Sequence, residues 1–418
     1  MGVEQAEPTF GSEDEMTMLT KSPAPVLPPP QTSSSLVGWL RANLFSTWYN
    51  TLLTLGLVAG LALAARPIWH WVFSVAHWQA VTINLRLFMV GLYPSEQVWR
   101  PGVLLILLAW LWGGSAACNR GMMQSVSTTL LAGLVLLTLL LTAQARVIVG
   151  GAALALLGGY GLGWRWPQAR RLWHVGWFLS VPLVLIVLGG MGGTGLPPVA
   201  TTQWGGLMLT LLLAAVGIVA SFPLGLLLAL GRQSELPVIR WCAIAYIELV
   251  RGVPLVSVLM MFSLLLPLFL PASWGRPNTL LRILVGLTLF TAAYMAENVR
   301  GGLQAIPRGQ YEAATALGLT WVQAMRYIIL PQALRAVIPA LVGQCISLFK
   351  DTSLATIIGS LELLGIAKSV IEQAEWKSLT GGVVFEVFLF TAVVYGVFTY
   401  NMSYLSRRLE KTLGVGTR

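Results

Sequence analysis

The sequence predicts an all-α polytopic integral membrane protein with about ten transmembrane helices. Of its 418 residues, 56% are hydrophobic and only 10% are charged, against a charged share of about 25% in soluble domains. The apolar residues also form runs of roughly 18 or more, the length at which a helix crosses a hydrocarbon core about 30 Å thick. A water-soluble enzyme needs more charged surface, so that class is excluded.

The net charge of +10 comes from 26 Lys and Arg residues against 16 Asp and Glu residues. These charges are spread singly over short loops, so the preference of Lys and Arg for the cytoplasmic side explains them better than nucleic-acid binding does. The three cysteines, Cys118, Cys242 and Cys345, lie within or beside apolar segments without paired spacing. They are expected to be packing residues rather than disulfide partners or metal ligands.

Residues 1–38 differ in kind from the rest of the chain. They contain an acidic run around Asp14, a proline-rich run at 23–30 and a Thr/Ser stretch, which is typical of a disordered tail. The basic start and short apolar core of a cleavable signal peptide are missing, so the tail is expected to be retained.

Ten apolar segments follow the tail and are predicted to be membrane helices. They are residues 49–68, 101–118, 125–143, 147–164, 172–192, 204–231, 241–270, 280–297, 334–354 and 382–404. An even number places both termini on one side. With both termini inside, about 17 of the 26 Lys and Arg residues are cytoplasmic, as the positive-inside rule requires, and residues 407–418 form a cytoplasmic C-terminal tail.

The predicted outer loop 69–100 is rich in aromatic residues. Its rings belong to Trp69, Trp71, Trp78, Phe88, Tyr93 and Trp99, and the pattern favours an amphipathic segment lying in the membrane interface. His70 and His77 share a helix face by spacing, but no carboxylate or cysteine stands near them. They are therefore read as interface residues rather than metal ligands.

A long polar loop, residues 300–335, separates the eighth and ninth predicted helices. Good helix formers run from Gln310 to Leu317 and end at Gly318, a natural left-handed cap. Thr320 and Gln323 then have capping-box spacing, so a second helix is expected from Trp321 to about 330, where Pro331 should end or kink it. A helix-turn-helix hairpin on the cytoplasmic face results, which either docks a partner or covers the end of the bundle.

The residues of this loop resemble the EAA signature of permease subunits of ABC importers. Every signature position is filled at the family's spacing, by Glu312, Ala313, Ala314, Gly318, Ile328, Leu330 and Pro331. The resemblance implies that the loop is the coupling helix that sits in a groove of a cytoplasmic ATPase. These seven residues are thereby expected to carry the ATPase coupling.

Other stretches resemble one branch of that family, the polar amino-acid permeases. They are Glu248-Leu-Val-Arg-Gly-Val-Pro254, Ala293-Tyr-Met-Ala-Glu297, Arg300-Gly-Gly302, Gly309-Gln310, Pro331-Gln-Ala-Leu-Arg335 and Lys350-Asp-Thr-Ser-Leu354. Residues 201–406 are thus expected to form a five-helix permease core. Residues 39–200 form an extension of about five helices, in which Asn84 to Gln97 is similar to the long permeases of general and neutral amino-acid importers.

Charged side chains within spans are costly and often mark a pathway. Glu297 either meets a substrate ammonium group or pairs with Arg300, three residues away. Glu248 and Arg251 share a helix face, and they either neutralise each other or face a pathway. Gly252 and Pro254 follow directly and are expected to interrupt the helix after Arg251.

Lys350, Asp351 and Ser353 follow the apolar part of the ninth span. A zwitterionic amino acid needs a cation for its carboxylate and an acceptor for its ammonium group, and these residues have the right types. Together with Glu297 and Arg251 they are the candidate substrate-pathway residues. The alternative is that the opposite charges of Lys350 and Asp351 simply cancel.

No phosphate-binding Gly-x-x-x-x-Gly-Lys-Ser/Thr loop occurs in the sequence, so no intrinsic enzyme activity is expected. The resemblance implies an amino-acid importer of the bacterial inner membrane, with no cofactor on this chain and ATP-Mg on the ATPases. Its partners would be a second related permease, two ATPase subunits, a periplasmic binding protein and lipid. Rival readings are an ion-coupled secondary transporter, which should show inverted repeats, and a membrane scaffold.

Overall fold

A computed structural model describes residues 36–118, 122–140, 143–191, 195–271, 273, 275–379 and 381–414. Nearly all of the predicted disordered tail, residues 1–35, lies outside the described residues. The described part is helical apart from two isolated bridges, and it divides into two compact units, Met1–Ala76 and His77–Arg418.

The first unit contains one long apolar helix. Its elements are α2 (Leu36–Asn43), α3 (Trp48–His70) and the π-helical continuation η1 (Trp71–Val75). The Thr47 side chain accepts a hydrogen bond from the backbone N–H of Asn50 and so caps α3, as an N-cap threonine does. No residue of α3 is buried within the chain, and its exposed leucines suit a helix surrounded by lipid.

The second unit begins with the rest of the N-terminal extension. Its elements are α4 (Gln79–Ile83), α5 (Leu85–Val90), η2 (Ser95–Gln97), α6 (Trp99–Cys118), α7 (Met122–Leu140), α8 (Ala143–Arg165), η3 (Pro167–Ala169), α9 (Arg170–Gly189) and η4 (Thr201–Gln203). Glycines bring α6 and α8 into close contact: a Cβ atom built at Gly159 would lie 2.1 Å from the carbonyl oxygen of Trp110. Small residues at such crossings are typical of membrane helices.

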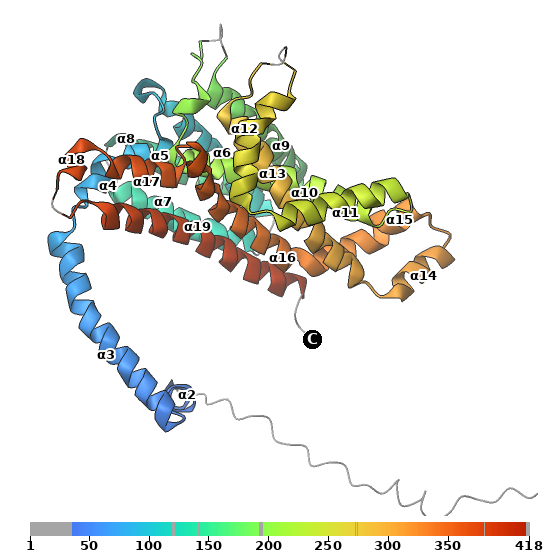
Figure 1. Cartoon of the computed structure of the whole chain (residues 1–418), viewed down its shortest axis with the longest axis horizontal. Helices are drawn as coiled ribbons and strands as arrows, with labels where there is room; N and C mark the ends of the chain where they lie inside the picture. Colours follow the sequence, from blue (N-terminus) through green and yellow to red (C-terminus); the bar gives the residue numbers. More distant parts are fainter. Residues whose placement is uncertain are drawn as a thin grey trace, which may run out of the picture. The chain divides into compact units, whose positions relative to one another are not determined.

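The C-terminal half forms the second part of this unit. Its elements are α10 (Gly206–Arg232), α11 (Pro237–Gly252), α12 (Leu255–Phe269), α13 (Thr279–Gln304), α14 (Arg308–Ala316), α15 (Trp321–Ala324), η6 (Met325–Ile329), α16 (Leu330–Asp351), η7 (Thr352–Ile358), α17 (Leu363–Ile371), α18 (Ala374–Lys377) and α19 (Val384–Leu413). Helices α10, α13 and α16 pack against one another, and the hairpin of α14 and α15 projects from one end of the bundle (Figure 1).

Eight helices in the described part are long and apolar enough to cross a membrane. The pair α11 and α12 adds a ninth crossing if it is counted as one bent span, and α7 contains a shorter apolar helix at 126–135. All ten predicted segments are therefore helical. The segment 241–270 is not one straight helix, because the chain turns by 108° between Gly252 and Leu255, at the predicted Gly-Pro interruption.

The second helix of the cytoplasmic hairpin does not end at Pro331. Instead α15, η6 and α16 run on as one helical stretch into the ninth span, so of the two outcomes expected at Pro331, an end or a kink, the end is wrong. In a regular α-helix the ring of Pro331 would clash with the carbonyl group four residues earlier. That carbonyl, on Tyr327, lies in the π-helical stretch, where the Leu330 N–H bonds to Met325 O, five residues back. The wider turn accommodates the proline.

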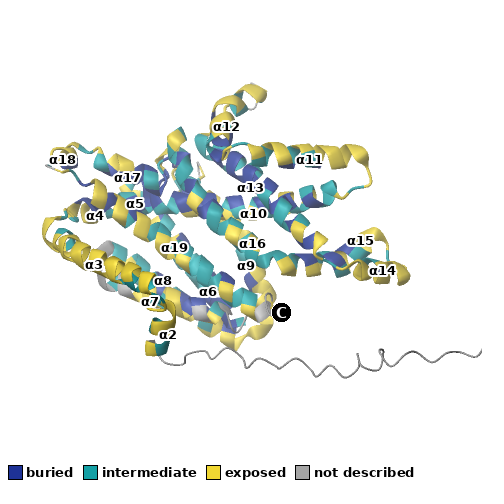
Figure 2. Cartoon of the chain, turned by 60° about the horizontal axis from the view of Figure 1, so that its bottom comes forward, coloured by how far each residue is buried: buried dark blue, intermediate teal, exposed yellow. Residues whose placement is uncertain are grey.

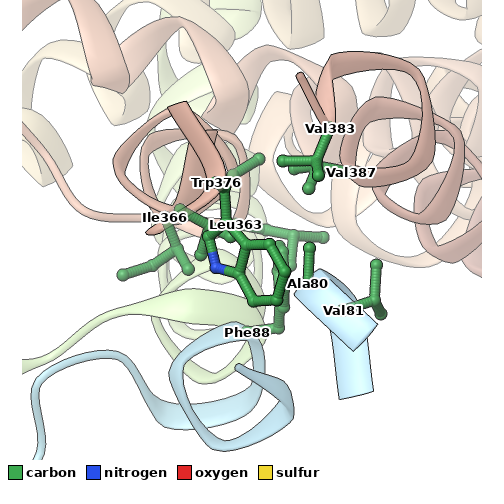
Figure 3. Packing of buried hydrophobic residues seen from close by; sticks show 10 residues of the cluster. Ala80, Val81, Phe88, Leu363, Ile366, Trp376, Val383 and Val387 are labelled. Atoms are coloured by element: carbon green, nitrogen blue, oxygen red, sulfur yellow. The ribbon is translucent and has the colours of Figure 1, made fainter. Parts of the chain in front are cut away.

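The predicted interfacial segment 69–100 is only partly exposed. Phe88 and Tyr93 have no exposed surface, whereas Trp69 and Trp99 are exposed. Phe88 packs with Ala80 and Val81 against Leu363 and other residues of α17, α18 and α19 (Figure 3). Helices α4 and α5 are thus covered by the C-terminal half of the same unit, and their position at the membrane interface stays a prediction.

Burial follows the helix packing. Buried residues concentrate on α10 and α13, whereas α3 and α11 show long exposed stretches (Figure 2). Helix α13 has the largest buried share of any candidate span, 56% of its most apolar window. It is the central helix of the C-terminal half, and the cytoplasmic hairpin follows its end directly.

Candidate functional site

The first helix of the cytoplasmic hairpin ends in a glycine cap. Gly318 has a φ of 71° and accepts the left-handed conformation that other residues avoid. The N–H of Leu319 donates to Ala314 O and that of Gly318 donates to Thr315 O, the hydrogen-bond pattern of a Schellman motif. The predicted cap is confirmed. A Cβ atom added at Gly318 would meet nothing within 4 Å, so only the φ angle, and not space, selects glycine.

The second helix of the hairpin begins with the predicted capping box. Thr320 accepts from the N–H of Gln323, and the Gln323 side chain accepts from the N–H of Thr320 at 2.9 Å. Apolar side chains on the outside of the hairpin are unusually exposed; they are Leu317 (74%), Trp321 (55%) and Val322 (63%). The hairpin thus carries an exposed apolar surface between two capped helix ends, which is typical of a docking surface.

The signature residues divide between this outer surface and the anchor of the hairpin. Glu312, Ala313 and Pro331 are exposed, Ala314 is fully buried, and Ile328 and Leu330 are half-buried. The anchor is a buried cluster of Ala229, Ile247, Ala296, Val299, Leu303, Met325, Ile329 and Ala333, against which Tyr311 also packs. Burial raises the pKa of the Tyr311 hydroxyl, and that hydroxyl donates to Leu303 O.

A charge cluster lies at the same end of the bundle. Glu297 accepts from Nε of Arg300 at 2.9 Å, and its Oε2 lies 3.4 Å from Nη1 of Arg251 and 3.6 Å from Nη1 of Arg232. Arg232 also binds Glu248 at 2.9 Å. The expected pair of Glu297 with Arg300 is present. Glu248 and Arg251 do not pair with each other, because their side chains reach to α10 and α13 instead.

The other candidate pathway residues lie at the end of α16. Lys350 is exposed, whereas Asp351 and Ser353 are half-buried, and Ser353 donates to Lys350 O. No ion pair between Lys350 and Asp351 is present in the described part of the chain. Contact of these residues, of Glu297 and of Arg251 with a substrate stays a prediction.

A second buried polar cluster surrounds Glu362, which the sequence reasoning missed. Its carboxylate caps α17 by accepting from the N–H groups of Leu364 and Gly365, and the Tyr395 hydroxyl donates to it at 3.0 Å. Burial raises the pKa of Glu362 to about 7, while these hydrogen bonds act in the opposite direction. The sequence signal was a lone glutamate three residues after Gly359 and three before Gly365.

Arg232 also escaped the sequence reasoning, because it was counted only as a topology signal at the end of a span. No group of three or more His, Cys, Asp or Glu residues that could hold a metal ion occurs among the residues that the structure describes. The cysteines Cys118, Cys242 and Cys345 are all free.

The sequence matches known transport proteins over its length. Residues 221–413 match the family model described as "Binding-protein-dependent transport system inner membrane component". The inner membrane amino-acid ABC transporter permease protein YhdY of Escherichia coli (strain K12) is 37% identical over 407 residues, covering 94% of this chain and 97% of the relative.

A second long relative and one solved structure are also similar to this chain. The glutamate/glutamine/aspartate/asparagine transport system permease protein BztC of Rhodobacter capsulatus is 36% identical over 449 residues, covering 95% of this chain and 96% of the relative. A solved structure, described as a crystal structure of an amino acid ABC transporter with histidines, is 30% identical. It covers 49% of this chain and 91% of its own, with a TM-score of 0.44.

The long relatives match this chain from end to end, so the similarity includes the N-terminal extension that precedes the family model. The signature hairpin, with its glycine cap and its exposed apolar surface, lies inside the matched range 221–413. The chain belongs to the family of binding-protein-dependent transport system inner membrane components, the permease subunits of ABC importers.

Proposed function

We propose that this chain is the membrane-spanning permease subunit of an ATP-driven importer that moves amino acids from the periplasm to the cytoplasm. The observation that carries the proposal is the hairpin of α14 and α15. Both of its helix ends are fixed by caps, while its outer apolar side chains remain exposed. The substrate class is supported by two long relatives whose names specify amino acids or glutamate, glutamine, aspartate and asparagine.

The proposed complex contains a second related permease, two cytoplasmic ATPase subunits and a periplasmic amino-acid-binding protein. The chain itself holds no cofactor, since its sequence has no phosphate-binding loop, and ATP-Mg binds to the ATPases. Catalysis of ATP hydrolysis therefore belongs to the partners. ATP closes the ATPase dimer, the dimer moves the hairpin, and the helices that follow switch the pathway between its two faces.

A bulky residue on the hairpin tests this proposal. Ala313 is exposed on α14, so Ala313→Trp leaves the chain's own packing intact and obstructs a partner's groove. We expect the variant to insert into the membrane normally, to lose the co-purifying ATPase and to lose uptake of radiolabelled amino acids by at least about tenfold, which is the effect of a 1.4 kcal/mol loss of docking free energy.

Ala374 provides the matched control, because it is an exposed alanine in α18, near the opposite end of α19 from the hairpin (Figure 1). Ala374→Trp should retain the ATPase. Uptake that persists in Ala313→Trp after the ATPase is lost would contradict the proposal and favour an ion-coupled transporter. Retention of the ATPase without uptake in the unmodified complex would favour a scaffold.

A further inference from the structure

Helix α11 is weakly packed compared with its neighbours. Of the 16 residues in Pro237–Gly252, only Ala243 and Ile247 are buried, whereas Trp241 and Leu249 are at least 65% exposed. At its end the chain turns by 108° into α12 through an extended joint at Val253 and Pro254. An element with little buried apolar surface and a joint at one end is suited to rigid-body movement.

Polar contacts also attach α11 to its neighbours. Glu248 binds Arg232 of α10, Arg251 approaches Glu297 of α13, and the Tyr246 hydroxyl donates to Leu289 O at 2.8 Å. The charged side chains are partly open, with 22% to 55% of their surface exposed. Ion pairs at such exposure are weak enough to exchange, because water competes for both partners.

Glu297 is the centre of the charge cluster. Arginines from three different helices lie within 4 Å of it: Arg232 of α10, Arg251 of α11 and Arg300 of α13. With Glu248, the cluster holds three positive and two negative charges, a net charge of +1. Removal of the Glu297 charge raises the net charge to +2, so the three guanidinium groups would repel one another and separate α11 from α10 and α13.

Arg251 has binding capacity that this conformation does not use. Its guanidinium lies 5.5 Å from the ring centre of Tyr294, yet its Nε is buried and has no hydrogen-bond partner among the described residues. A buried unsatisfied donor is unusual. Arg251 is thus held here by Glu297 and the Tyr294 ring rather than by a full set of hydrogen bonds.

The cytoplasmic hairpin contacts the same region through the buried anchor cluster. Ile247 of α11 packs there with Val299 and Leu303 of α13 and with Met325 and Ile329 of η6. Tyr311 of α14 packs against that cluster and donates to Leu303 O. A displacement of the hairpin therefore reaches α11 and the charge cluster through contiguous packed side chains.

We propose that Glu297 is a positioning residue for transport coupling: it locks α11 onto α10 and α13 in this conformation, and movement of the hairpin releases the lock so that α11 turns about Val253 and Pro254. The inference rests on the proposed function. In this role Glu297 acts through the three arginines, and its carboxylate is occupied by them rather than by a substrate ammonium group.

The native Cys242 allows a direct test, because it is exposed on α11. The complete complex is reconstituted with Cys118→Ala and Cys345→Ala in this chain and no other reactive thiol, and Cys242 carries an environment-sensitive maleimide fluorophore. In the complex with an unmodified Glu297, addition of ATP together with EDTA, which prevents hydrolysis, should shift the emission of the fluorophore on Cys242. In Glu297→Gln the nucleotide-free emission should already match the shifted state, and ATP hydrolysed per amino acid imported should rise at least about threefold.

Two further variants separate a lock from a general packing role. Arg251→Gln should behave like Glu297→Gln, whereas Arg251→Lys, which keeps the charge, should restore most of the coupling. The double variant Arg232→Glu with Glu248→Arg exchanges the two charges of this ion pair. Its coupling should be closer to that of the unmodified complex than the coupling of either single variant. The exposed pair Lys377 and Glu372 lies outside the cluster, so Glu372→Gln should leave both readouts unchanged.

The outcomes distinguish the two proposals. If the unmodified complex imports no amino acid, the proposed function fails. If it imports normally but the Cys242 label does not respond to nucleotide, the movement of α11 is wrong. The lock is also overturned if Glu297→Gln and Arg251→Gln keep the original emission and the original ratio of ATP to amino acid.

Discussion

At the scale of single residues, Glu362 has the environment best suited to sensing pH. It has no exposed surface, and burial raises its pKa from 4.5 to about 7. The carboxyl group holds its proton more tightly in the folded chain than in the unfolded chain. Its protonation therefore stabilises the folded state, and this stabilisation is fully present below pH 4.5. That contribution disappears as the pH rises through 7, and it corresponds to roughly 3 kcal/mol.

We therefore expect the unmodified protein to gain thermal stability as the pH falls from 8 to 5, and Glu362→Gln to lose most of that slope. A glutamine does not ionise and, like the protonated carboxyl group, offers one carbonyl oxygen to the N–H groups of Leu364 and Gly365, so the stability of the variant relative to the original should rise between pH 5 and pH 8. Glu372→Gln is the control, because Glu372 caps the other end of α17 and is exposed. An unchanged slope in Glu362→Gln would refute the assignment.

At the scale of elements, the contact between α6 and α8 depends on glycines that leave no room for a side chain. A Cβ atom at Gly159 would lie 2.1 Å from Trp110 O, whereas one at Gly158 would meet nothing within 4 Å. Gly159→Ala should force the two helices apart and destabilise the protein by about 1–3 kcal/mol. Gly158→Ala should be neutral or stabilising, because alanine favours helix.

Thermal unfolding in nanodiscs compares the two neighbouring substitutions under identical conditions. Equal melting temperatures for the two variants would mean that α6 and α8 are not packed as this structure places them. A selective loss of stability in Gly159→Ala would also explain why the N-terminal extension is rich in glycine, since close helix contact in lipid requires small residues.

Helix positions and caps were predictable from sequence, whereas departures from regular geometry were not. The Gly318 cap and the Thr320 capping box follow from short-range hydrogen-bond chemistry, so spacing alone identified them. Pro331 was expected to end or kink a helix; the helix does not end there, because a π-helical stretch before the proline removes the clash. Such an adjustment depends on the packing of Met325 and Ile329 in the anchor cluster, which no local pattern reveals.

Candidate site residues showed the same division. The helices that carry the signature residues of the hairpin were predictable from local sequence. Two partners of Glu297, by contrast, come from α10 and α11, which are distant from it in the sequence. Sequence spacing found only Arg300, its neighbour three residues on. Phe88 and Tyr93 were placed at the membrane surface because aromatic composition does not distinguish an interface from a buried contact between distant segments.

At the scale of the whole molecule, the side of the membrane on which the N-terminus lies depends on α7. Eight candidate spans and the bent pair give nine crossings. If α7, an apolar helix of 19 residues from Met122 to Leu140, crosses as well, the count is ten and both termini share one side. In the proposed complex the hairpin faces the cytoplasm, where it meets an ATPase, so α19 would end there too, and about 17 of the 26 Lys and Arg residues would then satisfy the positive-inside rule.

We therefore expect a fluorescent protein fused to residue 1 to fold and fluoresce in the cytoplasm, and an alkaline phosphatase fused there to remain inactive. A C-terminal fusion is the matched control and should behave in the same way. Active phosphatase at the N-terminus with a cytoplasmic C-terminus would mean nine crossings. In that case α7 would lie within the extension without crossing the membrane, held there by contacts such as the hydrogen bond from Trp112 to the Ser127 hydroxyl.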